Sequence, residues 1–272
     1  MCKKDRETAK NDSLKVINPE ASSSKGASSA TGTLYAIGVG PGDPELITLK
    51  ASKILGSIKY LFAATSKGEK ESLALKIAMP HVKNGPEIIP LMFPMVRDKE
   101  ALEKAWNEAA KKVCEPLFKG MDAAFVTLGD PSTYSTFTYL HRKLKAMAPG
   151  LKVEIIPGIT SFQAAAARLQ VPLAEAEESL AVVSGAKGSR EIRQILPYCD
   201  NLVIMKAYRH YGEIVRCLEE MGLAQKTMAV RRVGLEGESV TTRLKEWDGQ
   251  KPSYFTLLLT KKGKREKKLH DS

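Results

Sequence analysis

The sequence predicts an α/β protein with two domains, the first built on a mostly parallel sheet and the second on a mixed sheet. Short apolar segments alternate with segments of helical periodicity, and this alternation favours parallel strands covered by helices on both faces. The pattern changes at Val171–Glu178, where Pro172 and three acidic residues indicate a crossover between domains. Several strands are followed by turns rich in glycine and proline, and open α/β sheets bind ligands at such joints.

The first domain is expected to span residues 33–172. Its strands are short runs rich in apolar residues and bounded by turn or charged residues. These strands are Thr33–Val39, Lys59–Ala63, Glu87–Pro90, Asp122–Val126 and Lys152–Ile156. Between them, apolar residues at helical spacing predict helices, the longest of which is capped by Asp98. These helices are Leu46–Leu55, Glu71–Met79, Asp98–Phe118, Thr133–Ala146 and Ser161–Leu169.

The second domain is expected to span residues 173–260. The same two patterns predict helices at Ser189–Leu196 and Tyr211–Met221. The expected strands are Leu180–Val183, Asn201–Met205, Thr227–Arg231, Glu238–Arg243 and Tyr254–Thr260. The last two are expected to run antiparallel, which gives a mixed sheet of a kind common in α/β proteins.

The ends of the chain carry much of its net charge of +11. Residues 1–32 contribute +2 and include a low-complexity run of serine and alanine, so they are expected to form a disordered polar tail. Residues 261–272 contribute +4 and form a basic tail. A mildly basic body suits a polyanionic small substrate. Because no aromatic residues interleave with Lys261–Lys268, nucleic acid is not expected as a partner.

Cysteine and histidine spacing argues against a metal site. The four cysteines are far apart in the sequence, show no paired spacing, and are Cys2, Cys114, Cys199 and Cys217. The four histidines are equally scattered, so no protein-bound metal is expected. Free thiols indicate a reducing, cytoplasmic location. No apolar run approaches the roughly 20 residues that span a bilayer, and the N-terminus lacks a signal core, so no membrane partner is expected.

Four turn-rich joints are the candidate ligand-binding elements, at Gly38–Pro44, Leu128–Thr136, Pro157–Ser161 and Arg232–Gly234. The second begins at the apolar end of a strand, breaks at Gly129, and runs into hydroxyl residues predicted to open a helix. A strand end, a tight turn and a helix N-terminus together expose backbone N–H groups beside a crevice. We therefore interpret the chain as a scaffold that brings these four joints together.

The individual motifs exclude some chemistries. The first joint lacks the third glycine of a dinucleotide-binding turn, because Asp43 stands there, and no phosphate-binding Gly-Lys-Ser/Thr run is present. Asp130 is either a helix cap with Pro131 at the first helical position, or also a ligand for ribose hydroxyls or a cationic group. No nucleophile–base pair stands out, so the catalytic residues are unknown. Asp248 and the cluster Glu175–Glu178 are more consistent with a solvated face or linker than with general bases.

Taken together, three segments resemble the tetrapyrrole methylase family. They are Gly38–Ala51 (GVGPGDPELITLKA), Leu128–Thr136 (LGDPSTYST) and Val153–Ser161 (VEIIPGITS), within a likeness that covers about Thr33–Thr260. The resemblance implies two αβα domains, S-adenosylmethionine bound in the cleft between them, and a homodimer. The second segment is most similar to precorrin-2 C-20 methyltransferases. This implies methylation of C-20 of precorrin-2 or cobalt-precorrin-2, an anionic tetrapyrrole, in cobalamin biosynthesis.

The resemblance also implies site residues. The cofactor contacts would be Pro41, Leu128, Gly129, Asp130, Thr133, Thr160, Ser161, Met205, Lys206 and Gly234. Substrate contacts would be Gly40, Gly42, Asp43 and Tyr134. Many members carry Met-Gly where this chain has Met205-Lys206. The donor is already activated, so no protein nucleophile is required.

Three alternative functions remain open at this point. One is a sibling methylase that acts on another corrin position. The second is an RNA or protein methyltransferase of the same fold. The third is a non-catalytic nucleotide-binding module.

Overall fold

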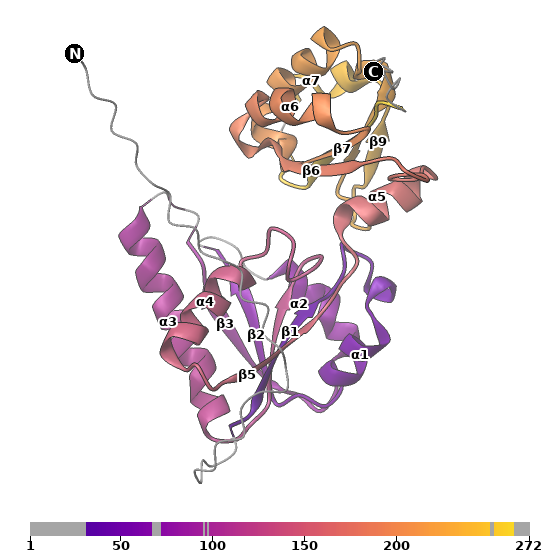
Figure 1. Ribbon diagram of the computed structural model, residues 1–272. Helices are drawn as coiled ribbons and strands as arrows, with labels where there is room; N and C mark the ends of the chain where they lie inside the picture. Colours follow the sequence, from indigo (N-terminus) through magenta and orange to yellow (C-terminus); the bar gives the residue numbers. More distant parts are fainter. Residues whose placement is uncertain (1–30, 67–71, 95, 97, 251–252, 264–272) are drawn as a thin grey trace, which may run out of the picture.

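The computed structural model describes residues 31–66, 72–94, 96, 98–250 and 253–263. Almost all of the expected N-terminal tail and most of the expected C-terminal tail therefore lie outside the described residues. The rest forms two five-stranded sheets, each with its own helices (Figure 1). The first sheet is wholly parallel and the second is mixed, so the predicted fold class is confirmed.

The first sheet has the strand order β3-β2-β4-β1-β5. Its strands are β1 (Thr33–Gly38), β2 (Tyr60–Thr65), β3 (Glu87–Met92), β4 (Ala123–Thr127) and β5 (Lys152–Ile156). Every residue of β4 is buried, as expected for a central strand covered on both faces. Because all five strands are parallel, their carboxyl ends lie at one edge of the sheet, where the joints begin.

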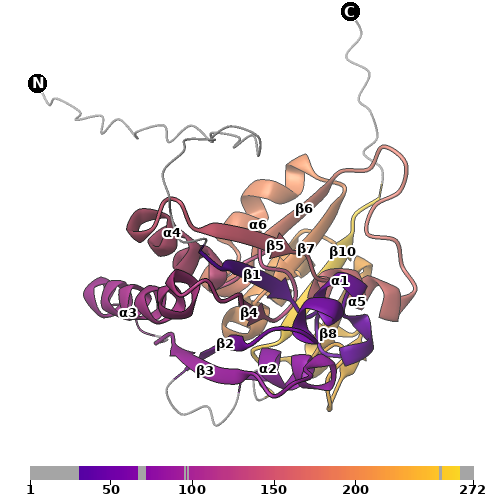
Figure 2. The same cartoon turned by 90° about the horizontal axis from the view of Figure 1, so that it is seen from below.

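Four helices cover the two faces of this sheet, and they are α1 (Leu49–Leu55), α2 (Leu73–Ala78), α3 (Lys99–Phe118) and α4 (Phe137–Met147). The first two share one buried cluster with the sheet, and the last two share a cluster on the opposite face (Figure 2). Asp98 begins α3 as predicted, because its carboxylate accepts hydrogen bonds from the N–H groups of Glu100 and Ala101.

The second sheet has the strand order β6-β7-β10-β8-β9. Its strands are β6 (Leu180–Ser184), β7 (Asn201–Met205), β8 (Thr227–Arg231), β9 (Ser239–Thr241) and β10 (Thr256–Lys261). Helices α6 (Arg190–Ile195) and α7 (Tyr211–Glu220) cover one face. Short 3-10 turns complete the described elements, at Pro44–Leu46, Met79–His81, Gly185–Lys187, Leu196–Tyr198, Ala207–His210, Ala224–Lys226 and Leu244–Trp247.

Helix α5 (Ser161–Leu169) covers the other face of the second sheet, although it directly follows β5 of the first. Its buried face is the run Ala164–Ala166, which lies in one cluster with Val203, Val230 and Leu257. By packing, this helix belongs to the second sheet, whereas the sequence-based boundary between the domains falls later, after residue 172.

The predicted helix start at Thr133 is wrong. Residues 131–136 form an irregular turn, and α4 begins only at Phe137. Tyr134 has a left-handed backbone with φ of 50°, which a helix cannot contain. The Ser135 hydroxyl instead accepts a hydrogen bond from the Phe137 N–H, so Pro131 is not the first residue of a helix.

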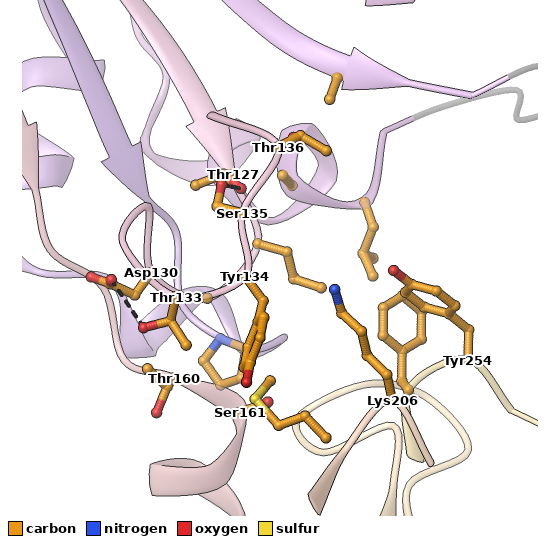
Figure 3. Close-up of a pocket in the computed structure, with 18 of the residues that line it drawn as sticks. Thr127, Asp130, Thr133, Tyr134, Ser135, Thr136, Thr160, Ser161, Lys206 and Tyr254 are labelled. Atoms are coloured by element: carbon orange, nitrogen blue, oxygen red, sulfur yellow. Dashed lines mark hydrogen bonds between the residues drawn. The ribbon is translucent and has the colours of Figure 1, made fainter. Parts of the chain in front are cut away.

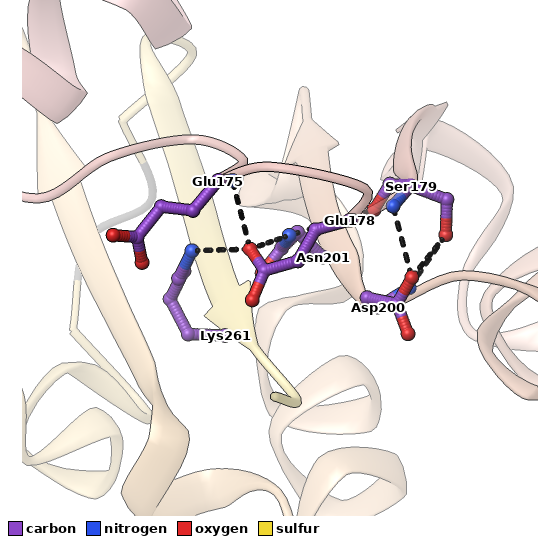
Figure 4. Close-up of polar contacts among 6 residues, drawn as sticks. All are labelled: Glu175, Glu178, Ser179, Asp200, Asn201 and Lys261. Atoms are coloured by element: carbon purple, nitrogen blue, oxygen red, sulfur yellow. Dashed lines mark hydrogen bonds and ion pairs between the residues drawn. The ribbon is translucent and has the colours of Figure 1, made fainter. Parts of the chain in front are cut away.

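A polar network anchors the crossover between α5 and β6 to the second sheet (Figure 4). Glu178, whose side chain is only 9% exposed, accepts hydrogen bonds from the Asn201 amide and the Glu175 N–H and pairs with Lys261. The neighbouring Asp200 carboxylate accepts hydrogen bonds from both the N–H and the hydroxyl of Ser179. These contacts lie where β7 begins, at the opposite end of the strand from Met205.

We expect this network to make stability depend on acid pH. Hydrogen bonds from Asn201 and Glu175, with Lys261 nearby, hold the pKa of Glu178 below its usual value against the opposing effect of burial. The carboxylate therefore stabilises the fold above its unfolded-state pKa, and this contribution disappears as pH falls through the lower folded-state pKa. Glu178→Gln should lower the Tm at pH 7, and the gap to the unmodified protein should close toward acid pH.

The matched control is Glu177→Gln, an exposed neighbour. Its Tm should follow that of the unmodified protein at every pH, measured by circular dichroism. If the Tm difference between Glu178→Gln and the unmodified protein stayed constant from pH 7 to acid pH, the assigned role would be contradicted.

Among the described residues, every helix is too short or too polar to cross a membrane.

Candidate active site

The molecule has a first half, built on β1–β5, and a second half, built on β6–β10 together with α5. A cavity of about 510 Å³ lies between these two halves (Figure 3). Its first wall comes from the carboxyl ends of β2 and β4 and from the turn after β4. Its second wall comes from the end of β7, the start of β10 and the segment after β8. The cavity thus lies where the geometry of parallel sheets places ligand sites.

The first and second joints are held together by their backbones. Gly129 N–H donates to the Gly40 carbonyl at 2.7 Å, and Gly40 N–H donates to Gly129 O at 3.3 Å. Both glycines have positive φ, 82° at Gly40 and 70° at Gly129. A Cβ on Gly129 would meet only Ile159 O, at 4.0 Å, so the space beside this backbone is open. A ligand can therefore approach the Gly129 backbone closely.

Asp130 joins the second joint to the third. One carboxylate oxygen accepts from the Ser132 N–H at 2.8 Å, and the other accepts from the Gly158 N–H at 3.0 Å. The carboxylate thus bridges two turns that are separated by 28 residues in sequence. Asp130 caps a turn, as expected, but the turn is not the first turn of a helix.

The turn after Asp130 extends toward the second half. The hydroxyls of Thr127 and Ser135 are 2.9 Å apart and buried, which fixes the base of the turn. Tyr134 then projects across the cavity, and its hydroxyl donates to the Val182 carbonyl of β6 at 3.4 Å. Burial, followed by the charge of Glu191, raises the pKa of the Tyr134 phenol, so this group remains a neutral donor.

The third joint is fixed by a capping box at the start of α5. The Thr160 hydroxyl accepts from the Gln163 N–H, and the Gln163 side-chain oxygen accepts from the Thr160 N–H at 3.0 Å. Thr160 and Ser161 both line the cavity.

The fourth joint meets the first across the halves. A Cβ on Gly42 would lie 2.5 Å from Gly234 O, so the two backbones are in direct contact. Glu238 accepts from the Gly234 N–H at 2.7 Å and pairs with Arg168 of α5. All four joints therefore meet, as the sequence interpretation predicts.

The described wall of the cavity holds one cation and one anion, and the structure shows no ion pair between them. Among its described residues, Lys206 is the cation and Asp130 the anion, and the Asp130 carboxylate already binds two backbone N–H groups. The Lys206 ammonium lies 5.2 Å from the centre of the Tyr134 ring. Burial lowers the pKa of Lys206, and no carboxylate contributes to the shift.

Most of the predicted site residues line this cavity. The predicted cofactor contacts at the wall are Pro41, Leu128, Gly129, Asp130, Thr133, Thr160, Ser161, Met205 and Lys206. The predicted substrate residue Tyr134 joins them. Gly234 stands behind the wall, which its neighbours Val233 and Leu235 form. Gly40, Gly42 and Asp43 lie in the adjoining loop outside the cavity lining.

Sequence reasoning missed several wall residues. They are Ala64–Ser66 at the end of β2, Ser72 and Leu73 at α2, Phe93 after β3, and Tyr254–Leu257 around the start of β10. The first and third groups lie at or just after the carboxyl ends of parallel strands, a signal that could have found them. Tyr254–Leu257 lie at the start of an antiparallel strand and carry no such signal.

The two weaker base candidates lie away from the cavity. Glu178 is at the far end of β7, and Asp248 lines a separate small hollow with Arg231 and Trp247. Among the described residues, no three side chains of His, Cys, Asp or Glu gather as a metal ion would require.

Residues 33–248 match the family described as Tetrapyrrole (Corrin/Porphyrin) Methylases. A cobalt-precorrin-2 C(20)-methyltransferase from Salmonella typhimurium is 37% identical over 232 residues, 85% of this chain and 97% of the relative. A precorrin-2 C(20)-methyltransferase from a Sinorhizobium species is 30% identical over 235 residues, 84% of this chain and 94% of the relative.

A solved structure shows the same fold. It is a uroporphyrin-III C-methyl transferase from Thermus thermophilus, complexed with S-adenyl homocysteine. The TM-score is 0.57 at 21% identity, and the match covers 84% of this chain and 97% of that one.

Proposed function

This chain belongs to the tetrapyrrole (corrin/porphyrin) methylase family, and from that premise we propose that it methylates C-20 of precorrin-2 or cobalt-precorrin-2. The resemblance drawn from the motifs is confirmed by the family match. The protein is an S-adenosylmethionine-dependent C-methyltransferase of cobalamin biosynthesis. The observation that carries the C-20 assignment is its likeness, over nearly the whole length, to relatives named for that position.

The cavity fits S-adenosylmethionine in size and chemistry. Its wall combines apolar side chains with the hydroxyls of Thr133, Thr160 and Ser161, which suit an adenosine with a charged tail. The open space beside the Gly129 backbone is a cradle that any side chain would fill. We propose that the predicted contacts hold the cofactor here, with Gly234 supporting the wall from behind.

S-adenosylmethionine supplies a methyl group on a positively charged sulfur, which an electron-rich carbon accepts without help from a protein nucleophile. The protein's part is to hold two reactants in line and to exclude water. Such positioning can contribute about 7–11 kcal/mol to lowering a barrier.

The tetrapyrrole is proposed to lie against the first joint. Gly40, Gly42 and Asp43 belong to the loop beside the cavity, and Tyr134 stands at the cavity with 47% of its surface exposed. The acetate and propionate arms of the substrate are anionic, which suits the basic body of this protein.

The test is the position of the new methyl group. Precorrin-2 and cobalt-precorrin-2 would each be incubated with S-adenosylmethionine carrying a ¹³C methyl group, and the product analysed by NMR. The expected result is one labelled methyl on C-20. A methyl on another ring carbon would instead assign the protein to a sibling activity. Transfer to RNA or protein, with none to tetrapyrrole, would refute the proposed substrate class.

We propose a homodimer, which the exposed apolar side chains of Ile88 and Met92 on the edge strand β3 support. We propose a cytoplasmic location, which fits the free and buried cysteines 114, 199 and 217.

A further inference from the structure

Lys206 stands out in the cavity wall because of its backbone. It follows the last residue of β7 and has a left-handed conformation, with φ of 56°. Glycine adopts this conformation without cost, whereas a side chain with a Cβ is strained there. The next residue, Ala207, is fully buried, so the chain cannot easily relax at this point. A strained residue held by a rigid surround is a reason to look for a function.

The Lys206 side chain points into the cavity. Its ammonium group lies beside the ring of Tyr134, and Tyr254 belongs to the same cavity wall (Figure 3). Tyr134, from the first half, is itself strained in the left-handed region, with φ of 50°. Two strained residues from opposite halves therefore meet in one contact, the ammonium 5.2 Å from the Tyr134 ring centre.

Within the part of the chain that the structure describes, no carboxylate pairs with this cation. Burial alone accounts for the lowering of the Lys206 pKa. The Asp130 carboxylate binds the Ser132 and Gly158 N–H groups instead. Burial removes part of the water around this ammonium, and the Tyr134 ring does not fully compensate for that loss. An anionic ligand would compensate for it with a charge-assisted hydrogen bond.

We propose that Lys206 binds a carboxylate of a ligand in the cleft. The inference rests on the proposed function, because that function defines the ligands. Two ligands could supply this carboxylate: the methionine half of S-adenosylmethionine, or one of the acetate and propionate arms of the tetrapyrrole. The Tyr134 ring covers one side of the ammonium and directs its remaining N–H donors toward the ligand.

The experiment uses the full chain and two binding measurements. Calorimetry gives the affinity for S-adenosylhomocysteine and for 5′-methylthioadenosine, which lacks the carboxylate. Fluorescence gives the affinity for sirohydrochlorin, a stable oxidised relative of precorrin-2. The variants are Lys206→Met, which removes the charge, and Lys206→Arg, which keeps it. Lys187→Met is the matched control, since Lys187 is exposed in the same half and does not line the cavity.

The expected result is a loss of affinity for one carboxylate ligand of about tenfold to a hundredfold in Lys206→Met, the size of a charge-assisted hydrogen bond. Lys206→Arg should recover most of it. A loss for S-adenosylhomocysteine with 5′-methylthioadenosine unaffected identifies the cofactor carboxylate. A loss for sirohydrochlorin, with a matching rise in KM and a weaker salt dependence, identifies the tetrapyrrole arm.

The inference is overturned if Lys206→Met leaves both S-adenosylhomocysteine and sirohydrochlorin affinity within twofold of the unmodified protein. It is also overturned if 5′-methylthioadenosine loses as much affinity as S-adenosylhomocysteine while sirohydrochlorin is unaffected, because the effect would then be on the adenosine part. If Lys206→Met is unstable, Lys206→Gly takes its place in the binding measurements. Glycine adopts the left-handed conformation without strain, so the Tm of Lys206→Gly should equal or exceed that of the unmodified protein.

Failure of the proposed function looks different. There the unmodified protein would not place a methyl on C-20, whatever residue stands at position 206. A protein that methylates C-20 but is insensitive to Lys206→Met would refute this inference alone.

Discussion

Gly158→Ala should lower the free energy of unfolding by about 3 kcal/mol or more, the upper end of the cost of overpacking. A Cβ at this position would lie 2.2 Å from Gly129 O and 2.7 Å from Gly38 C. Both atoms belong to backbone, so no side chain can rotate away to make room. The carboxyl ends of β1, β4 and β5 would have to move apart to make room. The resulting loss is a large fraction of the free energy of unfolding of an ordinary protein.

Gly150→Ala is the matched control for this substitution. Nothing lies within 4 Å of a Cβ built on Gly150, and its φ is not in the left-handed region. It should change stability by no more than about 0.5 kcal/mol. Urea denaturation followed by circular dichroism measures both variants. Equal midpoints for the two would show that the three glycine backbones are not packed as described.

Asp130→Ala should weaken binding of S-adenosylhomocysteine about tenfold or more and destabilise the fold by about 2–4 kcal/mol. The charged acceptor is lost for two backbone N–H groups and, at 3.5 Å, for the Thr133 hydroxyl. The carboxylate holds the Ser132 and Gly158 N–H groups, so its removal frees both the second and the third joint. Asp130→Asn keeps one acceptor oxygen, so its affinity for S-adenosylhomocysteine and its stability should lie between those of Asp130→Ala and the unmodified protein.

Asp98→Ala is the control that separates the expected effect of Asp130→Ala on stability from its expected effect on ligand binding. Asp98 accepts two backbone N–H groups in the same manner at the start of α3, but it does not line the cavity. Its loss should cost about 1 kcal/mol of stability, as for a helix cap. Calorimetry should find its affinity for S-adenosylhomocysteine unchanged. If Asp130→Ala also left that affinity unchanged, Asp130 would be a turn former and nothing more.

The strands and the four joints could be predicted because their signals are local. Apolar runs such as Ala123–Val126 end at glycine or proline, and parallel strands place these ends at one edge. Capping by Asp98 and Thr160 is equally local, since each side chain bonds N–H groups two or three residues away. These features depend on neighbours in sequence and are visible there.

Other features depend on distant contacts and were missed or misplaced. The left-handed Tyr134 is held by a hydrogen bond to Val182, 48 residues away, so the delayed start of α4 has no local signal. The alanine face of α5 could cover either sheet, and only the folded chain shows which. Lys206 was placed by family resemblance, but the direction of its side chain depends on the contact with Tyr134.

The passage from β5 to α5 has a mechanical consequence. Between residues 31 and 263 it is the one covalent crossing from the first half to the second, and every strand pairing stays within a single sheet. The halves can therefore swing apart about Pro157–Thr160 without breaking a strand ladder, and only side-chain and loop contacts such as Tyr134–Val182 must be released. Such an opening would expose the cavity to ligands and leave the buried hydrophobic clusters of each half intact.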